Sequence, residues 1–180
     1  MGAGGESQAP IVVPFVAVDI GAGCGGAGNA GYDPKADAVA QIDSAISEAK
    51  ERGKNVVLQV GGSWCPWCVR LHKFLTDDAE LRHRVTEDYV WVQIYYGKEN
   101  KNEKALSRLG DLRGYGVPVL VVLSPTGEVV HIQNTGELEE GEGYSKARVL
   151  EFLDRYAEVP VSGTFSLENV DTLRREEVLQ

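Results

Sequence analysis

The fold of this chain is decided by the stretch Gly62-Ser63-Trp64-Cys65-Pro66-Trp67-Cys68-Val69-Arg70-Leu71, in which two cysteines are separated by two residues. The stretch directly follows a strand-like run, Asn55-Val56-Val57-Leu58-Gln59-Val60, and directly precedes a helix-like one. Backbone N–H groups at the start of a helix lack partners within the helix, and their partial positive charge favours a thiolate at Cys65. Cys68, one turn along, is in reach to close a disulfide on Cys65. The stretch therefore predicts a redox-active dithiol.

Composition and charge narrow the class of protein. The chain has 180 residues, of which 43% are hydrophobic and 25% charged, so one domain with extensions fits better than two domains. A net charge of −9 argues against nucleic acid and anionic membrane surfaces as partners. No run approaches the roughly 20 apolar residues of a membrane span. Three cysteines are too few for a disulfide scaffold. The close pair is therefore best interpreted as a reactive pair, and Cys24 has no assigned role.

Residues 1–32 are expected to form an N-terminal extension, in which the apolar run 11–20 can form an edge strand. This run contains Pro14 and Asp19 and has no Lys or Arg before it, so it makes a poor signal peptide. The following residues 21–24 only faintly resemble a lipid-attachment site, and a glycine-rich loop is the preferred interpretation. The first residues of the chain are also open to interpretation as a leader that replaces a removed export signal.

Residues 33–157 alternate between helical and strand patterns, and residues 158–180 are expected to form a charged tail with a weak helical pattern. Alternation that ends in an antiparallel hairpin predicts an α/β domain with a mixed central sheet and helices on both faces. The first expected element is a helix capped by Asp33, with Pro34 in its first turn, and closed by Gly53. A strand over 56–60, the dithiol helix, a short helix over 76–85, a strand over 89–95 and a short helix ending at Gly110 are expected to follow. The last expected elements are strands over 119–123 and 128–133 joined by a turn over 124–127, an acidic solvated loop over 137–142 and a helix that begins at Ser145.

This order of elements, with Trp64-Cys65-Pro66-Trp67-Cys68 after the second strand and Val117-Pro118 before the next-to-last one, resembles the thioredoxin superfamily. The resemblance covers roughly residues 34–156 and implies a thioredoxin fold. More narrowly, the chain looks like bacterial thioredoxin-like proteins that carry a helix such as 45–50 before the active-site strand. Many of those proteins are exported, so the resemblance favours a periplasmic location, or a cytoplasmic one if no export signal was removed.

The resemblance also implies roles for individual residues. Cys65 would be the exposed attacking cysteine and Cys68 the more buried resolving one. Pro118 would be a cis-proline that lies against the dithiol, 53 positions after Cys65 (118 − 65 = 53). Val117 would then pair with an extended substrate chain through main-chain hydrogen bonds. The expected substrate-binding residues are Trp64, Pro66, Trp67, Val117 and Pro118.

Two positions depart from the thioredoxin pattern. Thioredoxins carry a buried acid six positions before the first cysteine, whereas this chain has Gln59, which cannot act as a base. The two residues between the cysteines are Pro66 and Trp67, where thioredoxin has Gly-Pro. Because these residues influence thiolate stability and the reduction potential, the chain is not expected to behave as an ordinary thioredoxin.

The expected function is that of a thiol–disulfide oxidoreductase that reduces protein disulfides, works without a cofactor and acts as a monomer. Its partners would be a disulfide-containing protein substrate and an upstream redox partner. Isomerisation and oxidation by the same dithiol remain open, as does a non-catalytic thioredoxin-fold module that binds or chaperones other chains.

A structural zinc site is the alternative interpretation of the cysteine pair. Such a site needs further ligands, and the candidates form a poor set, so no metal is expected. The histidines are expected to be solvated on charged helices or to lie on a strand face. The candidate ligands are Cys24, His72, His83 and His131.

Overall fold

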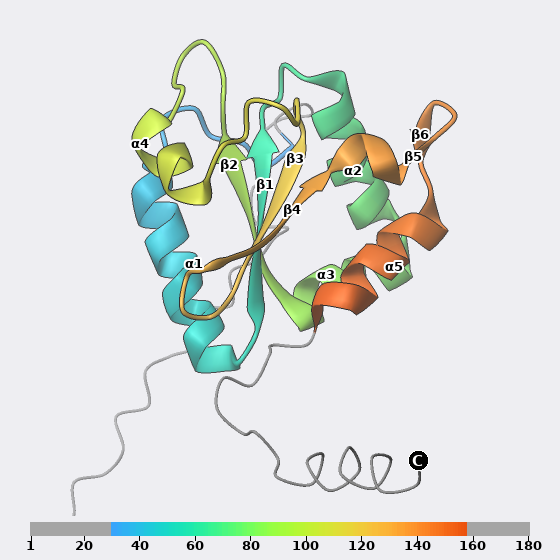
Figure 1. Ribbon diagram of the computed structural model, residues 1–180. Coiled ribbons are helices and arrows are strands. Elements are labelled where there is room, and N and C mark those ends of the chain that lie inside the picture. The colour runs from blue at the N-terminus through green and yellow to red at the C-terminus, as the bar shows by residue number, and fades with distance from the viewer. Residues whose placement is uncertain (1–29, 158–180) are drawn as a thin grey trace, which may run out of the picture.

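Four strands form the central sheet in the order β2-β1-β3-β4 (Figure 1). The computed structural model describes residues 30–157 of the 180-residue chain, so the expected strand at 11–20, Cys24 and the C-terminal tail lie outside the described residues. β1 pairs in parallel with β2 and antiparallel with β3, and β3 pairs antiparallel with β4. The predicted mixed sheet is therefore confirmed. The strands are β1 (Asn55–Gly61), β2 (Tyr89–Tyr95), β3 (Val119–Leu123) and β4 (Val129–Asn134).

Helices cover both faces of this sheet (Figure 1). One apolar layer joins one face of the sheet to α1 and α4, and a second layer joins the other face to α2, α3 and α5. All seven residues of β1 are buried, as expected for a strand covered on both faces. The helices are α1 (Ala38–Arg52), α2 (Pro66–Asp77), α3 (Ala79–Asp88), α4 (Glu103–Leu106), which runs on into a 3-10 turn, and α5 (Lys146–Ala157).

The start of the first helix corrects the sequence interpretation. α1 begins at Ala38, and the carboxylate of Asp37, not that of Asp33, accepts hydrogen bonds from the first free N–H groups. Asp33 instead accepts from the backbone N–H of Lys35, 2.8 Å away, in a turn that follows the buried Tyr32. Either aspartate can cap a helix, but this turn uses the carboxylate of Asp33. The predicted C-terminal end is confirmed.

The region between β4 and α5 also differs from expectation. The acidic run 137–142, expected to be a solvated loop, instead forms parts of a 3-10 turn, Thr135–Leu138, and of a short hairpin of β5 (Glu139–Glu140) and β6 (Gly143–Tyr144). Leu138 and Tyr144 are buried in the same apolar layer as α5. The buried side chains of Leu138, within the run, and Tyr144, just after it, therefore hold this segment against the domain.

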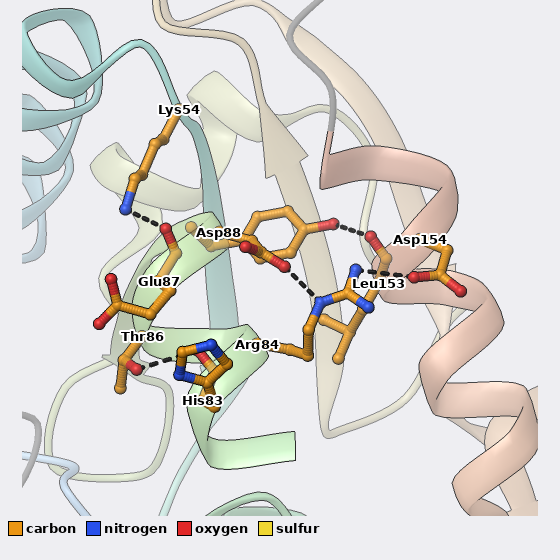
Figure 2. Close-up of polar contacts among 9 residues, drawn as sticks. Lys54, His83, Arg84, Thr86, Glu87, Asp88, Leu153 and Asp154 are labelled. Atoms are coloured by element: carbon orange, nitrogen blue, oxygen red, sulfur yellow. Dashed lines mark hydrogen bonds and ion pairs between the residues drawn. The ribbon is translucent and has the colours of Figure 1, made fainter. Parts of the chain in front are cut away.

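Polar contacts hold α3 and the start of β2 against α5 (Figure 2). The hydroxyl of Tyr89 donates to the backbone carbonyl of Leu153, and both groups are buried. The Arg84 guanidinium bridges Asp88 in its own helix and Asp154 in α5. Because Tyr89 pairs with the first residue of β1, these contacts lie at the end of the sheet opposite the dithiol.

Candidate active site

Cys65 is the N-cap residue of α2, at the point where the chain leaves β1. Its sulfur accepts a hydrogen bond from the backbone N–H of Cys68 at 3.3 Å, and Pro66 occupies the first turn, where no N–H is needed. The Cys65 sulfur therefore lies against the N–H groups of the helix start, which have no partners within the helix. Cys65 was expected to be exposed, but only 5% of it is accessible because Trp67 and Val117 pack against it.

Cys68 lies one turn further into α2 and is completely buried. Both cysteines are free thiols. Burial is the main cause that raises the pKa of Cys68 well above its ordinary value, and the hydrogen bond with Cys65 raises it further. Cys65 is thus the more accessible sulfur, and Cys68 lies behind it as a protonated thiol.

The Val117–Pro118 segment faces the dithiol from the start of β3. The peptide bond between the two residues is cis, as the resemblance implied. The Val117 carbonyl lies 3.6 Å from Cys65 Sγ, so these segments meet in space although they are 52 residues apart. Pro118 is buried, and its carbonyl accepts a hydrogen bond from the Thr135 hydroxyl at 2.6 Å.

The two tryptophans of the motif have different surroundings. Trp64 is 54% exposed, and its indole N–H donates to the Tyr96 carbonyl at 2.9 Å. Trp67 is half-buried and packs edge-on against Tyr144, with ring centroids 5.5 Å apart. Trp64 therefore offers free surface beside the dithiol, whereas Trp67 also belongs to the packing of α2 on the hairpin.

Two grooves lie on the Trp64 side of the site. One, of about 410 Å³, is lined by Trp64, Tyr96 and the polar turn 97–101. The other, of about 700 Å³, shares Tyr96 and extends to Val117 and apolar residues of the 106–112 segment. The Cys65–Val117 contact thus has recessed surface beside it.

The sequence analysis missed Tyr32, which is fully buried in one cluster with both cysteines. Its hydroxyl accepts a hydrogen bond from the Gln59 amide nitrogen at 2.7 Å. The same hydroxyl and the Cys68 sulfur both lie against Gly61, within one buried cluster. The Gln59 oxygen in turn accepts from the indole N–H of Trp91 at 3.2 Å. Gln59 was the available signal, because a polar side chain within an apolar strand needs a buried polar partner.

Gly61, the last residue of β1, is where backbone, Tyr32 and Cys68 come together. A Cβ atom added at Gly61 would lie 2.4 Å from Cys68 Sγ and 3.1 Å from the Tyr32 hydroxyl. The distance to the sulfur is far shorter than real Cβ contacts, and the distance to the hydroxyl is tighter than most of them. Only glycine lets the buried sulfur and the phenol sit side by side against the strand.

The zinc interpretation gains no support from the structure. Within residues 30–157, no group of three or more His, Cys, Asp or Glu side chains is placed to hold a metal ion. His131 stacks on Tyr156, with ring centroids 4.7 Å apart. His72 is half-buried beside Gln93 and not solvated as expected, and its burial lowers its pKa. Among the same residues, no helix has the length and apolar character needed to cross a membrane.

Comparisons with known proteins agree with the thioredoxin-like fold. The sequence profile of a family described as thioredoxin-like matches residues 37–125. A disulphide isomerase from Xylella fastidiosa Temecula1 is similar in structure, with a TM-score of 0.63 and 28% identity over 71% of this chain and 96% of that one. The C-terminal domain of Neisseria meningitidis DsbD in its oxidised form has a TM-score of 0.51 and 20% identity, over 67% and 97% of the two chains. Among curated proteins, no sequence matches this chain significantly.

Proposed function

Because this chain has a thioredoxin-like fold, we propose that it is a thiol–disulfide oxidoreductase that reduces protein disulfides through Cys65 and Cys68. One observation carries the proposal: the Cys65 sulfur lies at a helix start, 3.6 Å from the carbonyl before a cis-proline. The completely buried Cys68 lies directly behind it. One sulfur is thus placed to meet a substrate and the other to complete the reaction.

The proposed reaction has two steps. The Cys65 thiolate attacks one sulfur of a substrate disulfide, and the other substrate sulfur leaves as a thiolate. Cys68 then loses its proton and attacks Cys65, which forms the Cys65–Cys68 disulfide and releases the first substrate sulfur. The two protein sulfurs lose two electrons, and the substrate disulfide gains them and takes up two protons. An upstream dithiol partner would return the protein to its reduced state.

The substrate would be an extended protein segment that contacts Trp64, Pro66, Trp67, Val117 and Pro118. Trp64 and Pro66 are exposed beside Cys65, and the larger groove reaches Val117. Backbone pairing along Val117 would accept many sequences, and the indole surfaces favour apolar side chains next to the disulfide.

Disulfide isomerisation by the same dithiol is a second candidate. It is supported by the similarity to the Xylella fastidiosa structure, which is described as a disulphide isomerase and is covered over 96% of its length. In an isomerase, the mixed disulfide on Cys65 would persist until another substrate thiol displaced it. Reductase and isomerase therefore differ in how quickly Cys68 resolves that intermediate.

The first test replaces each cysteine singly by serine and measures the reduction of insulin disulfides. We expect Cys65→Ser to abolish the activity, because no thiolate remains at the helix start, whereas Cys24→Ser, which leaves both motif cysteines in place, retains it. Insulin reduction by Cys65→Ser at the parent rate would overturn the proposal.

The reduction potential of the Cys65–Cys68 pair tests the direction. A value near about −270 mV agrees with a reductase, and a value near about −120 mV would assign the protein to the oxidants. A scrambled-disulfide substrate that regains its native pairing in a stoichiometric reaction would favour the isomerase.

A further inference from the structure

Three buried side chains form a hydrogen-bonded series that ends beside the resolving cysteine. Trp91 is 7% exposed, and Gln59 and Tyr32 are completely buried. They come from β2, β1 and the loop before α1, and hydrogen bonds join them in that order. The Tyr32 hydroxyl and the Cys68 sulfur then lie together against Gly61, within one buried cluster. This chain of contacts ends on an atom that changes its bonding during the proposed reaction.

The direction of each hydrogen bond follows from Trp91, the first residue of the series, because its indole nitrogen can only donate. The Gln59 oxygen therefore faces Trp91 and the Gln59 amide nitrogen faces Tyr32. That nitrogen can only donate, so the Tyr32 oxygen accepts at 2.7 Å. The single hydroxyl hydrogen of Tyr32 is therefore free to point at Cys68.

We propose that Tyr32 donates its hydroxyl hydrogen to the Cys68 sulfur and thereby stabilises the Cys68 thiolate during disulfide exchange. The inference rests on the function proposed above and assigns a further residue to its second step. Gln59 and Trp91 are positioning residues, because they orient the phenol without touching sulfur. Burial, followed by the neighbouring cysteine charge, holds the pKa of Tyr32 well above its ordinary value. Tyr32 thus stays protonated and keeps the hydrogen that it donates.

Such a donor acts in both directions of the reaction. When Cys68 attacks the mixed disulfide, its S–H proton must first leave, and the phenol stabilises the negative sulfur that remains. When a thiolate attacks Cys65 in the oxidised protein, the Cys65–Cys68 bond breaks and its electron pair moves onto Cys68, where the same hydrogen bond receives it. In the first case Cys68 releases one proton, and the departing substrate thiolate takes up one, so the protons balance.

Several groups besides Tyr32 affect ionisation at Cys68. Burial and the adjacent Cys65 oppose it, whereas the backbone at Gly62 and the Tyr32 hydroxyl favour it. Tyr144, on the hairpin that packs against α2, is a further titratable neighbour whose own pKa burial raises. Among these groups, Tyr32 is the side chain that favours the thiolate, so its hydroxyl is the one to remove.

The test is a stopped-flow reaction of reduced protein with equimolar dithiobis(nitrobenzoate), in a Cys24→Ser background. Attack by Cys65 releases a first coloured nitrothiophenolate, and resolution by Cys68 releases a second. The two phases therefore report on the two sulfurs separately. For Tyr32→Phe we expect an unchanged first phase and a second phase slowed about 3- to 10-fold at neutral pH. Loss of the hydrogen bond lowers the fraction of Cys68 that is thiolate. The remaining thiolate is more nucleophilic, which on a logarithmic scale offsets about half of that loss.

The pH profile separates this role from a merely structural one. In Tyr32→Phe the second phase should need a higher pH to reach the parent rate, because the Cys68 thiolate forms less readily. The matched control is Tyr89→Phe, which also removes one buried hydroxyl but at the opposite end of the sheet, and both of its phases should match the parent. If Tyr32→Phe fails to fold, Gln59→Met removes the donor that orients Tyr32 and should slow the second phase by a smaller factor.

The possible kinetic results bear separately on the role of Tyr32 and on the proposed function. The role of Tyr32 is overturned, and the dithiol left intact, if the first phase is normal and the second phase is unaltered in Tyr32→Phe, or in Gln59→Met where Tyr32→Phe does not fold. Absence of the first phase in the parent protein overturns the proposed function itself. A second phase that slows equally in Tyr89→Phe means that loss of packing, and not the hydrogen bond to Cys68, causes the effect.

Discussion

Two buried tyrosines, at opposite ends of the sheet, use the same hydroxyl for different purposes. Tyr89 donates to the backbone carbonyl of Leu153 and thereby attaches β2 to α5. Tyr32 accepts a hydrogen bond from the Gln59 amide and packs in one buried cluster with Cys68. A backbone carbonyl keeps the same charge under all conditions, whereas a cysteine sulfur can be a thiol, a thiolate or half of a disulfide. The partner therefore determines whether a buried hydroxyl only stabilises the fold or also takes part in chemistry.

The surroundings of the two tyrosines differ as well. Beside Tyr89, the side chain of Arg84 is 28% exposed and that of Asp154 is 64% exposed, so their ion pair contributes about 0–1 kcal/mol to stability (Figure 2). Around Tyr32, the partners are neutral and almost completely buried. Electrostatic interactions are stronger in such a dry environment, and a change of charge there has larger effects.

The largest effect is expected from Gly61→Ala, which adds a methyl group 2.4 Å from Cys68 Sγ. Overpacking at such a site should lower the free energy of unfolding by about 2–3 kcal/mol and displace the sulfur from Cys65. Chemical denaturation and the second nitrothiophenolate phase measure the two consequences.

Gly114→Ala is the matched control for this substitution, because no atom lies within 4 Å of the added carbon there. It should change stability by less than about 0.5 kcal/mol. Equal effects of the two alanines would mean that the crowding around Cys68 does not constrain the strand.

An intermediate effect is expected from the two tyrosine-to-phenylalanine substitutions. Tyr89→Phe leaves the Leu153 carbonyl without its donor, and Tyr32→Phe leaves the Gln59 amide without its acceptor, so each should lower the free energy of unfolding by about 1–2 kcal/mol. Equilibrium unfolding should therefore hardly distinguish the two variants, whereas the kinetics of disulfide exchange should. The comparison fails if the variants also agree in their exchange kinetics.

The smallest effect is expected from the pH dependence of His72, on the dithiol side of the molecule. Burial lowers its pKa, and the nearby Asp77 only partly opposes this. As the pH falls below about 6.5, the unfolded chain binds a proton before the folded protein does, so stability decreases. At the Tyr89 end, the pKa of Arg84 is raised by its carboxylate partners, and the guanidinium stays charged throughout.

Unfolding of the parent and of His72→Gln, compared between neutral pH and about pH 5, measures this contribution. The decline with falling pH should be shallower in the variant, since glutamine binds no proton. If the free energy of unfolding declined equally with falling pH in the parent and in the variant, burial would not lower the pKa of His72.

Much of the fold could be predicted because the decisive signals are local. The alternating run of β2, the glycine that closes α1 and the position of Cys65 before a helix are each encoded within a few neighbouring residues. The expected meeting of Val117 with Cys65 relied on the family resemblance, and the 3.6 Å contact agrees with it. The roles of the individual site residues stay predictions that the cysteine and tyrosine variants address.

The remaining features depend on contacts that the sequence pattern does not encode. Gln59 was recognised as unusual, but its partner Tyr32 is 27 residues away in the chain, in a loop without regular periodicity. Asp33 and Asp37 are both suitable helix caps, and the choice between them depends on how the loop packs after Tyr32. The hairpin before α5 has two residues in each strand, too few for an alternating pattern to be visible.

The location of Tyr32 has a consequence for how this dithiol can be moved between proteins. The region shared with the thioredoxin-like family, residues 37–125, contains both cysteines and the cis-proline but excludes Tyr32. A chimera that transplanted only this region would carry the complete motif and lack the phenol against its buried sulfur. The portable unit therefore begins before the first helix, and a recipient scaffold must supply that loop as well as the motif.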